Sequence, residues 1–224
     1  MSAPAAARRG VVRNCIGVGV AVGTYGFAFG AASVSAGLSV LQTCLLSLLA
    51  FTGGTQFAVV GVVAGGGTLA AALGSGLLLG SRNALYAMRL APLLRVRGPR
   101  RLLAALGTID ESTAMAVGQK EEPLARLAFW WTFASVFLMW NLSTLLGAAG
   151  ATAIGDPQKF GLDAVIPAAF LALLAPRLRD GRIERRVALG GAVIAFVLIP
   201  ITPAGVPVLA ATAALLLAAR MRPS

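Results

Sequence analysis

Residues 14–81 read NCIGVGVAVGTYGFAFGAASVSAGLSVLQTCLLSLLAFTGGTQFAVVGVVAGGGTLAAALGSGLLLGS, and the fold class follows from them. It contains 68 consecutive residues without Asp, Glu, Lys or Arg. As one helix it would be roughly 100 Å long, whereas the hydrocarbon core of a bilayer is about 30 Å thick. No globular core needs such a run, so the sequence predicts an integral membrane protein.

The rest of the 224-residue chain supports this class, because 58% of it is apolar and only 12% is charged. Soluble domains usually carry about 25% charged residues. None of the apolar segments alternates as a barrel strand would, so we expect an all-α, polytopic helical bundle. The apolar segments cover approximately 14–35, 38–64, 68–94, 102–118, 127–149, 162–176, 187–200 and 206–219.

Basic residues cluster between these segments, and the positive-inside rule places such clusters on the cytoplasmic side. The chain must then cross the membrane an even number of times between clusters. Residues 14–94 accommodate two crossings plus a hairpin that dips into the membrane, or four tightly packed crossings, and we favour the hairpin. The prediction is about six crossings plus one or two re-entrant or broken helices. Residues 1–13 form a cytoplasmic basic N-terminus, and 14–222 form a single transmembrane transport domain with both termini inside.

The hairpin is expected to turn at Phe51–Gln56, where Gly53 and Gly54 are flanked by Thr52, Thr55 and Gln56. Adjacent glycines weaken a helix and free backbone groups. Irregular backbone at membrane depth is tolerated only where it is buried in protein or lines a cavity. A helix that restarts here exposes backbone amides, which bind a carboxylate well. Gly53, Gly54, Thr55 and Gln56 are therefore candidate substrate-binding residues.

Polar side chains inside the apolar segments are the other candidates, because a charge at the centre of a membrane helix costs about 2.5–3.5 kcal/mol. Arg82, Tyr86 and Arg89 share one helical face with Asn83 beside it. Arg89 can extend to the membrane surface, whereas Arg82 lies deeper and is expected to face a polar cavity or an acidic partner. Arg82, Asn83 and Tyr86 join the candidate binding residues.

Three carboxylates are candidates for proton coupling. Asp110 and Glu111 lie within the segment 102–118, at the start of an otherwise apolar helical run, and Asp163 opens the segment 162–176. Each can instead be an N-terminal cap, which stabilises free amides and the helix dipole. A buried carboxylate that takes up protons would suit a protein without histidine.

Several function classes are disfavoured. The absence of histidine removes imidazole as a ligand or base, and we predict no metal site, no cofactor and no enzymatic activity. Cys15 and Cys44 lie in apolar runs and are expected to be small buried hydrophobes. The net charge of +11 comes from arginines at segment ends, which fits membrane anchoring and not nucleic-acid binding. Residues 65–68, GGGT, lack the P-loop pattern.

Glycines at four-residue spacing indicate close helix–helix packing. The pairs are Gly19/Gly23, Gly26/Gly30, Gly61/Gly65 and Gly76/Gly80.

Six ordered motifs resemble the AzlC family over about residues 12–220. They are Tyr25–Gly30, Ala36–Ser39 with Gln42-Thr43, Phe51–Phe57, Ser81–Tyr86 with Leu90–Pro92, Thr108–Ser112 and Gly161–Asp163.

The resemblance implies a subunit of a secondary transporter in the bacterial inner (plasma) membrane. It would export branched-chain and related apolar amino acids by proton antiport, with a small AzlD-like membrane subunit as partner. Two alternatives are a permease of a multi-component transporter, for example of the ABC type, and an intramembrane assembly subunit. An accessible cavity at Gly53–Gln56 would count against the assembly role.

Overall fold

The computed structural model describes residues 4–154 and 165–216, and every regular element in these ranges is a helix. The expected all-α class is confirmed for them. The elements are α1 (Ala5–Gly23), α2 (Tyr25–Ser35), α3 (Val40–Leu49), α4 (Gly53–Ala64), α5 (Leu69–Gly80), α6 (Arg82–Leu94), α7 (Arg100–Leu106), α8 (Asp110–Val117), α9 (Glu122–Ile154), α10 (Val165–Asp180), α11 (Arg182–Leu198), α12 (Val206–Ala211) and a 3-10 turn, Thr212–Ala214.

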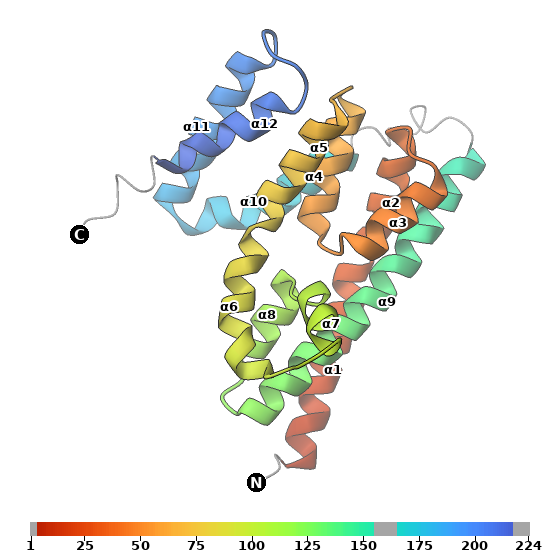
Figure 1. Ribbon diagram of the computed structural model, residues 1–224, viewed down its shortest axis with the longest axis vertical. Coiled ribbons are helices and arrows are strands. Elements are labelled where there is room, and N and C mark those ends of the chain that lie inside the picture. The colour runs from red at the N-terminus through yellow and green to blue at the C-terminus, as the bar shows by residue number, and fades with distance from the viewer. Residues whose placement is uncertain (1–3, 155–164, 217–224) are drawn as a thin grey trace.

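Two long helical segments, α1–α2 and α9, form the spine of the molecule. Residues Ala5–Ser35 and Glu122–Ile154 are each long and apolar enough to cross a membrane. Both segments start at the lower end of Figure 1 and rise side by side. They are parallel, because Gly19 lies against Ser135 whereas Gly30, further along, lies against Thr144 and Ala148.

The glycines of this spine allow its close packing. A Cβ added at Gly26 would lie 2.4 Å from the carbonyl oxygen of Trp140, and one at Gly30 would lie 2.1 Å from that of Thr144. Gly19 and Gly23 likewise contact α9. The packing role predicted for these two glycine pairs is therefore confirmed. Across the same interface, Ser135 Oγ donates to the carbonyl oxygen of Cys15 at 2.9 Å.

Two helical hairpins enter the bundle from opposite ends. The hairpin α3–α4 occupies the upper half of Figure 1, and α7–α8 occupies the lower half. Between them, α5 and α6 lead the chain from the upper end to the lower end. Residues 14–94 thus pass up the bundle through α1–α2, form a hairpin and pass down through α5 and α6. The two membrane crossings that we favoured for this stretch stay a prediction. The total of about six membrane crossings stays a prediction.

Some predicted segments are divided differently. The segment 68–94 is interrupted at Ser81, whose hydroxyl donates to the carbonyl oxygen of Leu78 at 2.6 Å. The segment 102–118 is interrupted at 107–109, where Thr108 Oγ1 donates to the carbonyl oxygen of Ala104 at 2.7 Å. In both places a hydroxyl bonds a backbone carbonyl of the preceding turn, which the apolar pattern did not reveal.

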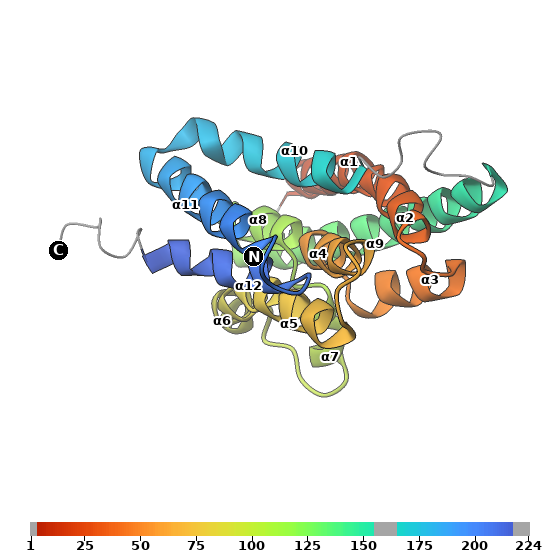
Figure 2. The ribbon, with the colours of Figure 1, turned by 90° about the horizontal axis from the view of Figure 1, so that it is seen from above.

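Helices α10, α11 and α12 lie along one side of the bundle (Figure 2), where α10 contacts α2 and α4 and α12 contacts α5. The predicted pair of short final helices is seen as α11, with 17 residues, and α12, with 6. Large apolar side chains point outward across the whole molecule, as on a lipid-facing surface. Examples are Leu49 and Leu77, both 76% exposed, and Phe196, 79% exposed.

Candidate functional site

A cavity of about 250 Å³ lies where the two hairpins meet the spine. Pockets for small ligands usually measure about 300–1,000 Å³, so this one fits a small solute. Its walls come from helices that are far apart in the sequence. They are formed by Val22, Tyr25, Phe51, Thr52, Gly53, Gly54, Phe57, Arg82, Ile109, Asp110, Glu111, Val136 and Trp140.

Four interruptions of helices converge on this cavity. They lie at Thr24, at 50–52, at Ser81 and at 107–109, and residues within or adjacent to each of them line the cavity. Among the described residues that line the cavity, those of α9 belong to a helix that is uninterrupted at this level. At a break, backbone N–H and C=O groups lack the intrahelical hydrogen bonds that they form in a continuous helix. The polar backbone of the bundle is thereby concentrated around one cavity.

The wall at the start of α4 lacks large side chains and is electropositive. Its first two residues are Gly53 and Gly54, and the preceding Thr52 makes no side-chain hydrogen bond to the helix. The first amides of a helix have no intrahelical partner, and the helix dipole adds partial positive charge there. A Cβ at Gly54 would lie 3.4 Å from Nη2 of Arg82. The α4 amides and a guanidinium therefore flank the same space.

The wall at the start of α8 carries negative charge. Asp110 and Glu111 occupy its first turn and line the cavity. Neither residue is the cap of α8, because the cap position is Ile109, whose N–H donates to Ser112 Oγ at 3.2 Å. Both carboxylates lie instead in the first turn, where their charge also stabilises the helix dipole, so that alternative stays open beside proton coupling.

The two walls are joined by an ion pair. Arg82 Nη2 lies 3.0 Å from Asp110 Oδ2, and both side chains are about one-third exposed, at 36% and 37%. Arg82 thus has an acidic partner, as its position inside an apolar segment predicted. Arg82 Nε and Asp110 Oδ1 are nevertheless buried without a hydrogen-bond partner among the described residues. Such unpaired groups cost about 1–3 kcal/mol each, so the pair retains capacity for further polar contacts.

The remaining walls are aromatic and are fixed by Gln56. Its Oε1 accepts from Trp140 Nε1 at 3.0 Å, while its Nε2 donates to the carbonyl oxygens of Ser47 and Ala50 at 3.2 and 3.0 Å. Gln56 thereby satisfies carbonyls near the end of α3 and orients the indole. The Trp140 ring stacks on Phe29, with centroids 6.0 Å apart, and meets Phe57 edge-on at 6.4 Å.

The structure brings together five of the predicted residues around the cavity, namely Gly53, Gly54, Arg82, Asp110 and Glu111. Four others do not line it: Gln56 is fully buried behind the wall, Thr55 packs against Gly76 and Gly80, and Asn83 and Tyr86 lie outside the lining. Asp163 falls outside the described residues.

Sequence reasoning missed the aromatic walls, which are formed by Tyr25, Phe51, Phe57 and Trp140. Aromatic residues in apolar segments are common and carry no local signal. For Phe51 and Phe57 alone, their places on either side of the glycine pair hinted at a role.

These features define a helical membrane protein in which interrupted helices surround a small, charge-lined cavity. A family model described as AzlC protein matches residues 17–154. The chain belongs to the AzlC family, and the resemblance inferred from its motifs is confirmed.

Two relatives are named as membrane proteins. An uncharacterized membrane protein of Archaeoglobus fulgidus is 31% identical over 182 residues, which are 80% of this chain and 80% of that protein. Inner membrane protein YgaZ of Escherichia coli is 27% identical over 156 residues, which are 66% of this chain and 64% of that protein. No solved structure matches the chain.

Proposed function

We propose that this chain is the large subunit of a secondary transporter that exports branched-chain and related apolar amino acids across the bacterial plasma membrane. The observation that carries the proposal is the cavity between the starts of α4 and α8, with opposite charges on facing walls and aromatic rings between them. A zwitterion with an aliphatic side chain needs these three kinds of contact.

The carboxylate of the substrate would bind the amides of Gly53 and Gly54 beside the Arg82 guanidinium. Its ammonium group would bind Asp110 and Glu111, and its side chain would lie against Phe51, Phe57 and Trp140. Binding would replace the direct contact between Arg82 and Asp110 with two contacts through the substrate. Each of the two charges would then have a partner on the substrate. The contacts with the substrate would therefore offset the cost of separating Arg82 from Asp110.

The hairpins supply a route to alternating access. One enters from each end of the bundle, and both break at the cavity. Movement of α3–α4 would open the cavity toward one side, and movement of α7–α8 would open it toward the other. Proton antiport follows if Asp110, Glu111 or Asp163 takes up a proton when the ammonium group leaves.

Leucine efflux from proteoliposomes tests this function. Vesicles that contain the chain, with and without a small AzlD-like membrane subunit, are loaded with leucine and given a pH gradient. We expect gradient-driven efflux that an uncoupler abolishes, and weaker coupling in Asp110→Asn, Glu111→Gln or Asp163→Asn. Efflux that the uncoupler leaves unchanged would contradict proton coupling, and normal coupled export by all three variants would contradict the carrier assignment.

We infer that the small subunit packs against the side formed by α11 and α12. None of the residues of α11, all of which are described, is buried, and Val193, Phe196 and Val197 are each more than half exposed. A cavity of this kind also argues against a purely assembly role for the chain. An ABC-type permease stays the alternative, and ATP-dependent efflux that is insensitive to the uncoupler would favour it.

A further inference from the structure

A second polar groove lies away from the cavity, at the end of the molecule where α1 and α9 begin. It has a volume of about 750 Å³ and surrounds the connection from α6 to α7. Its lining combines three arginines with apolar side chains and contains no carboxylate. The lining residues are Leu94, Arg95, Val96, Arg97, Pro99, Arg100, Leu103 and Trp130.

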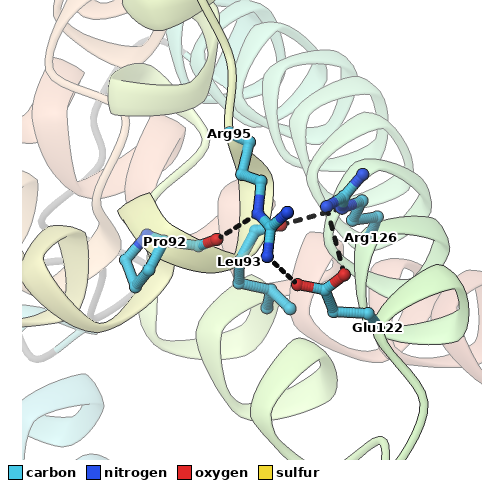
Figure 3. A network of polar contacts seen from close by, with 5 residues as sticks. All are labelled: Pro92, Leu93, Arg95, Glu122 and Arg126. Atoms are coloured by element: carbon cyan, nitrogen blue, oxygen red, sulfur yellow. Dashed lines mark hydrogen bonds and ion pairs between the residues drawn. The ribbon is translucent and has the colours of Figure 1, made fainter.

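The groove is built on a fixed network, shown in Figure 3. Arg95 Nε donates to the carbonyl oxygen of Pro92 at 3.1 Å, and Arg95 Nη2 lies 3.1 Å from Glu122 Oε1. Glu122 Oε2 also pairs with Arg126 at 3.3 Å, and Arg126 Nε donates to the carbonyl oxygen of Leu93 at 2.8 Å. One carboxylate thus serves two guanidinium groups, so the network holds the α6–α7 connection against α9 and keeps a net positive charge.

The other two arginines of the groove add to this excess. Within the described part of the chain, the side chains of Arg97 and Arg100 form no hydrogen bond or ion pair. Guanidinium groups bind phosphate oxygens in bidentate geometry, so three of them around one groove suit a phosphate group. Basic pockets between membrane helices on the cytoplasmic side bind anionic lipid head groups in this way.

The apolar side chains of the groove favour a phospholipid, and not free inorganic phosphate, as the source of the phosphate group. Trp130 and Leu103 belong to the lining, and Leu102 next to it is 74% exposed. Tryptophan is enriched at the level of lipid head groups, and exposed leucines there suit acyl chains. We propose that this groove is a specific binding site for the phosphate of an anionic phospholipid, with Arg97 and Arg100 as its principal ligands and Trp130 against the glycerol region.

Lipid binding to the purified full chain in neutral detergent tests the proposal. Phosphatidylglycerol and phosphatidylcholine are titrated separately, and bound lipid is counted by native mass spectrometry. We expect the chain to retain one phosphatidylglycerol molecule in preference to phosphatidylcholine. The double variant Arg97→Gln/Arg100→Gln should weaken phosphatidylglycerol binding at least about tenfold, because each arginine near an anionic head group contributes about fivefold.

The matched control is Arg89→Gln/Arg101→Gln, which removes the same charge from α6 and α7 without touching the groove lining. It should change the affinity less than twofold. An equal loss in both double variants would show diffuse attraction and would overturn the site. Equal retention of the two lipids would overturn the anionic preference. Displacement of phosphatidylglycerol by millimolar inorganic phosphate would show that free phosphate, and not lipid, is the ligand.

Discussion

The two hairpins are alike in architecture and opposite in chemistry. Each consists of two short helices, and in each the second helix starts at the central cavity. Helix α4 begins with two glycines and has no side-chain cap. Helix α8 is capped through Ser112, and its first turn carries two carboxylates. The amides of α4 are thus left for a ligand, while α8 presents acceptors. The difference provides one wall for the carboxylate of a zwitterion and the other for its ammonium group.

The ion pair between the walls should be the most sensitive point. We expect Arg82→Gln and Asp110→Asn each to reduce leucine efflux by about 10- to 100-fold, because each removes a charge-assisted contact of about 1.5–3 kcal/mol. Initial efflux rates from proteoliposomes measure the effect, with the exposed Arg101→Gln as the control for Arg82→Gln and the exposed Glu121→Gln as the control for Asp110→Asn.

The double variant Arg82→Gln/Asp110→Asn separates binding from folding. It removes both partners of the ion pair and so leaves neither of them as an unpaired charge, and its thermal stability should approach that of the parent chain. Its efflux should stay as low as that of the single variants. Recovery of efflux would mean that the pair only holds the helices together.

The bare wall is tested by adding one methyl group. Gly54→Ala places a Cβ 3.4 Å from Arg82 Nη2, in the space assigned to the carboxylate. We expect the KM for leucine to rise about tenfold, which corresponds to about 1.4 kcal/mol of lost binding. Gly150→Ala, whose Cβ would be 4.0 Å from Phe27, is the control with ordinary contacts. Equal KM values for the two variants would contradict the assignment of Gly54 to the binding site.

The hinge of α3–α4 depends on Gln56. Gln56→Ala removes three buried hydrogen bonds and should lower the free energy of unfolding by about 2 kcal/mol. Gln42→Ala removes only the bond from Ser39 N–H in the exposed capping box and should cost about 0.5–1 kcal/mol. Thermal melting in detergent compares the two, and a larger loss for Gln42→Ala would contradict this account of the hinge.

A smaller effect than that of Gln56→Ala is expected at the cap of α8. Ser112→Ala removes a fully buried hydroxyl that bonds Ile109 N–H and the carbonyl oxygen of Gly107, at a cost of about 1 kcal/mol. The adjacent Thr113 has a hydroxyl without a partner among the described residues, so Thr113→Ala should be nearly neutral. The same melting assay ranks them, and the reverse order would contradict the assignment of the cap.

The sequence predicted the first hairpin better than the second for a physical reason. The break at 50–52, directly before Gly53-Gly54, interrupts a long charge-free run, so the glycine pair made its cost in a membrane helix visible locally. The break at 107–109 contains one glycine, and the hydroxyls that stabilise it, Thr108 and Ser112, bond backbone groups that become available only when the chain turns. Gln56 illustrates the same limit. Its polar side chain beside the glycine pair suggested that it binds the substrate. Its amide instead forms hydrogen bonds with Trp140, 84 positions away, and with carbonyl oxygens near the end of α3.

The central claim is that opposite ends of a zwitterion bind the α4 and α8 walls. Binding of leucine, leucinamide and 4-methylpentanoate to the purified chain, followed by tryptophan fluorescence, tests it most directly. We predict that Gly54→Ala loses the preference for leucine over leucinamide, which lacks the carboxylate. Asp110→Asn should lose the preference for leucine over 4-methylpentanoate, which lacks the ammonium group. Equal weakening of all three ligands by both variants would contradict the claim.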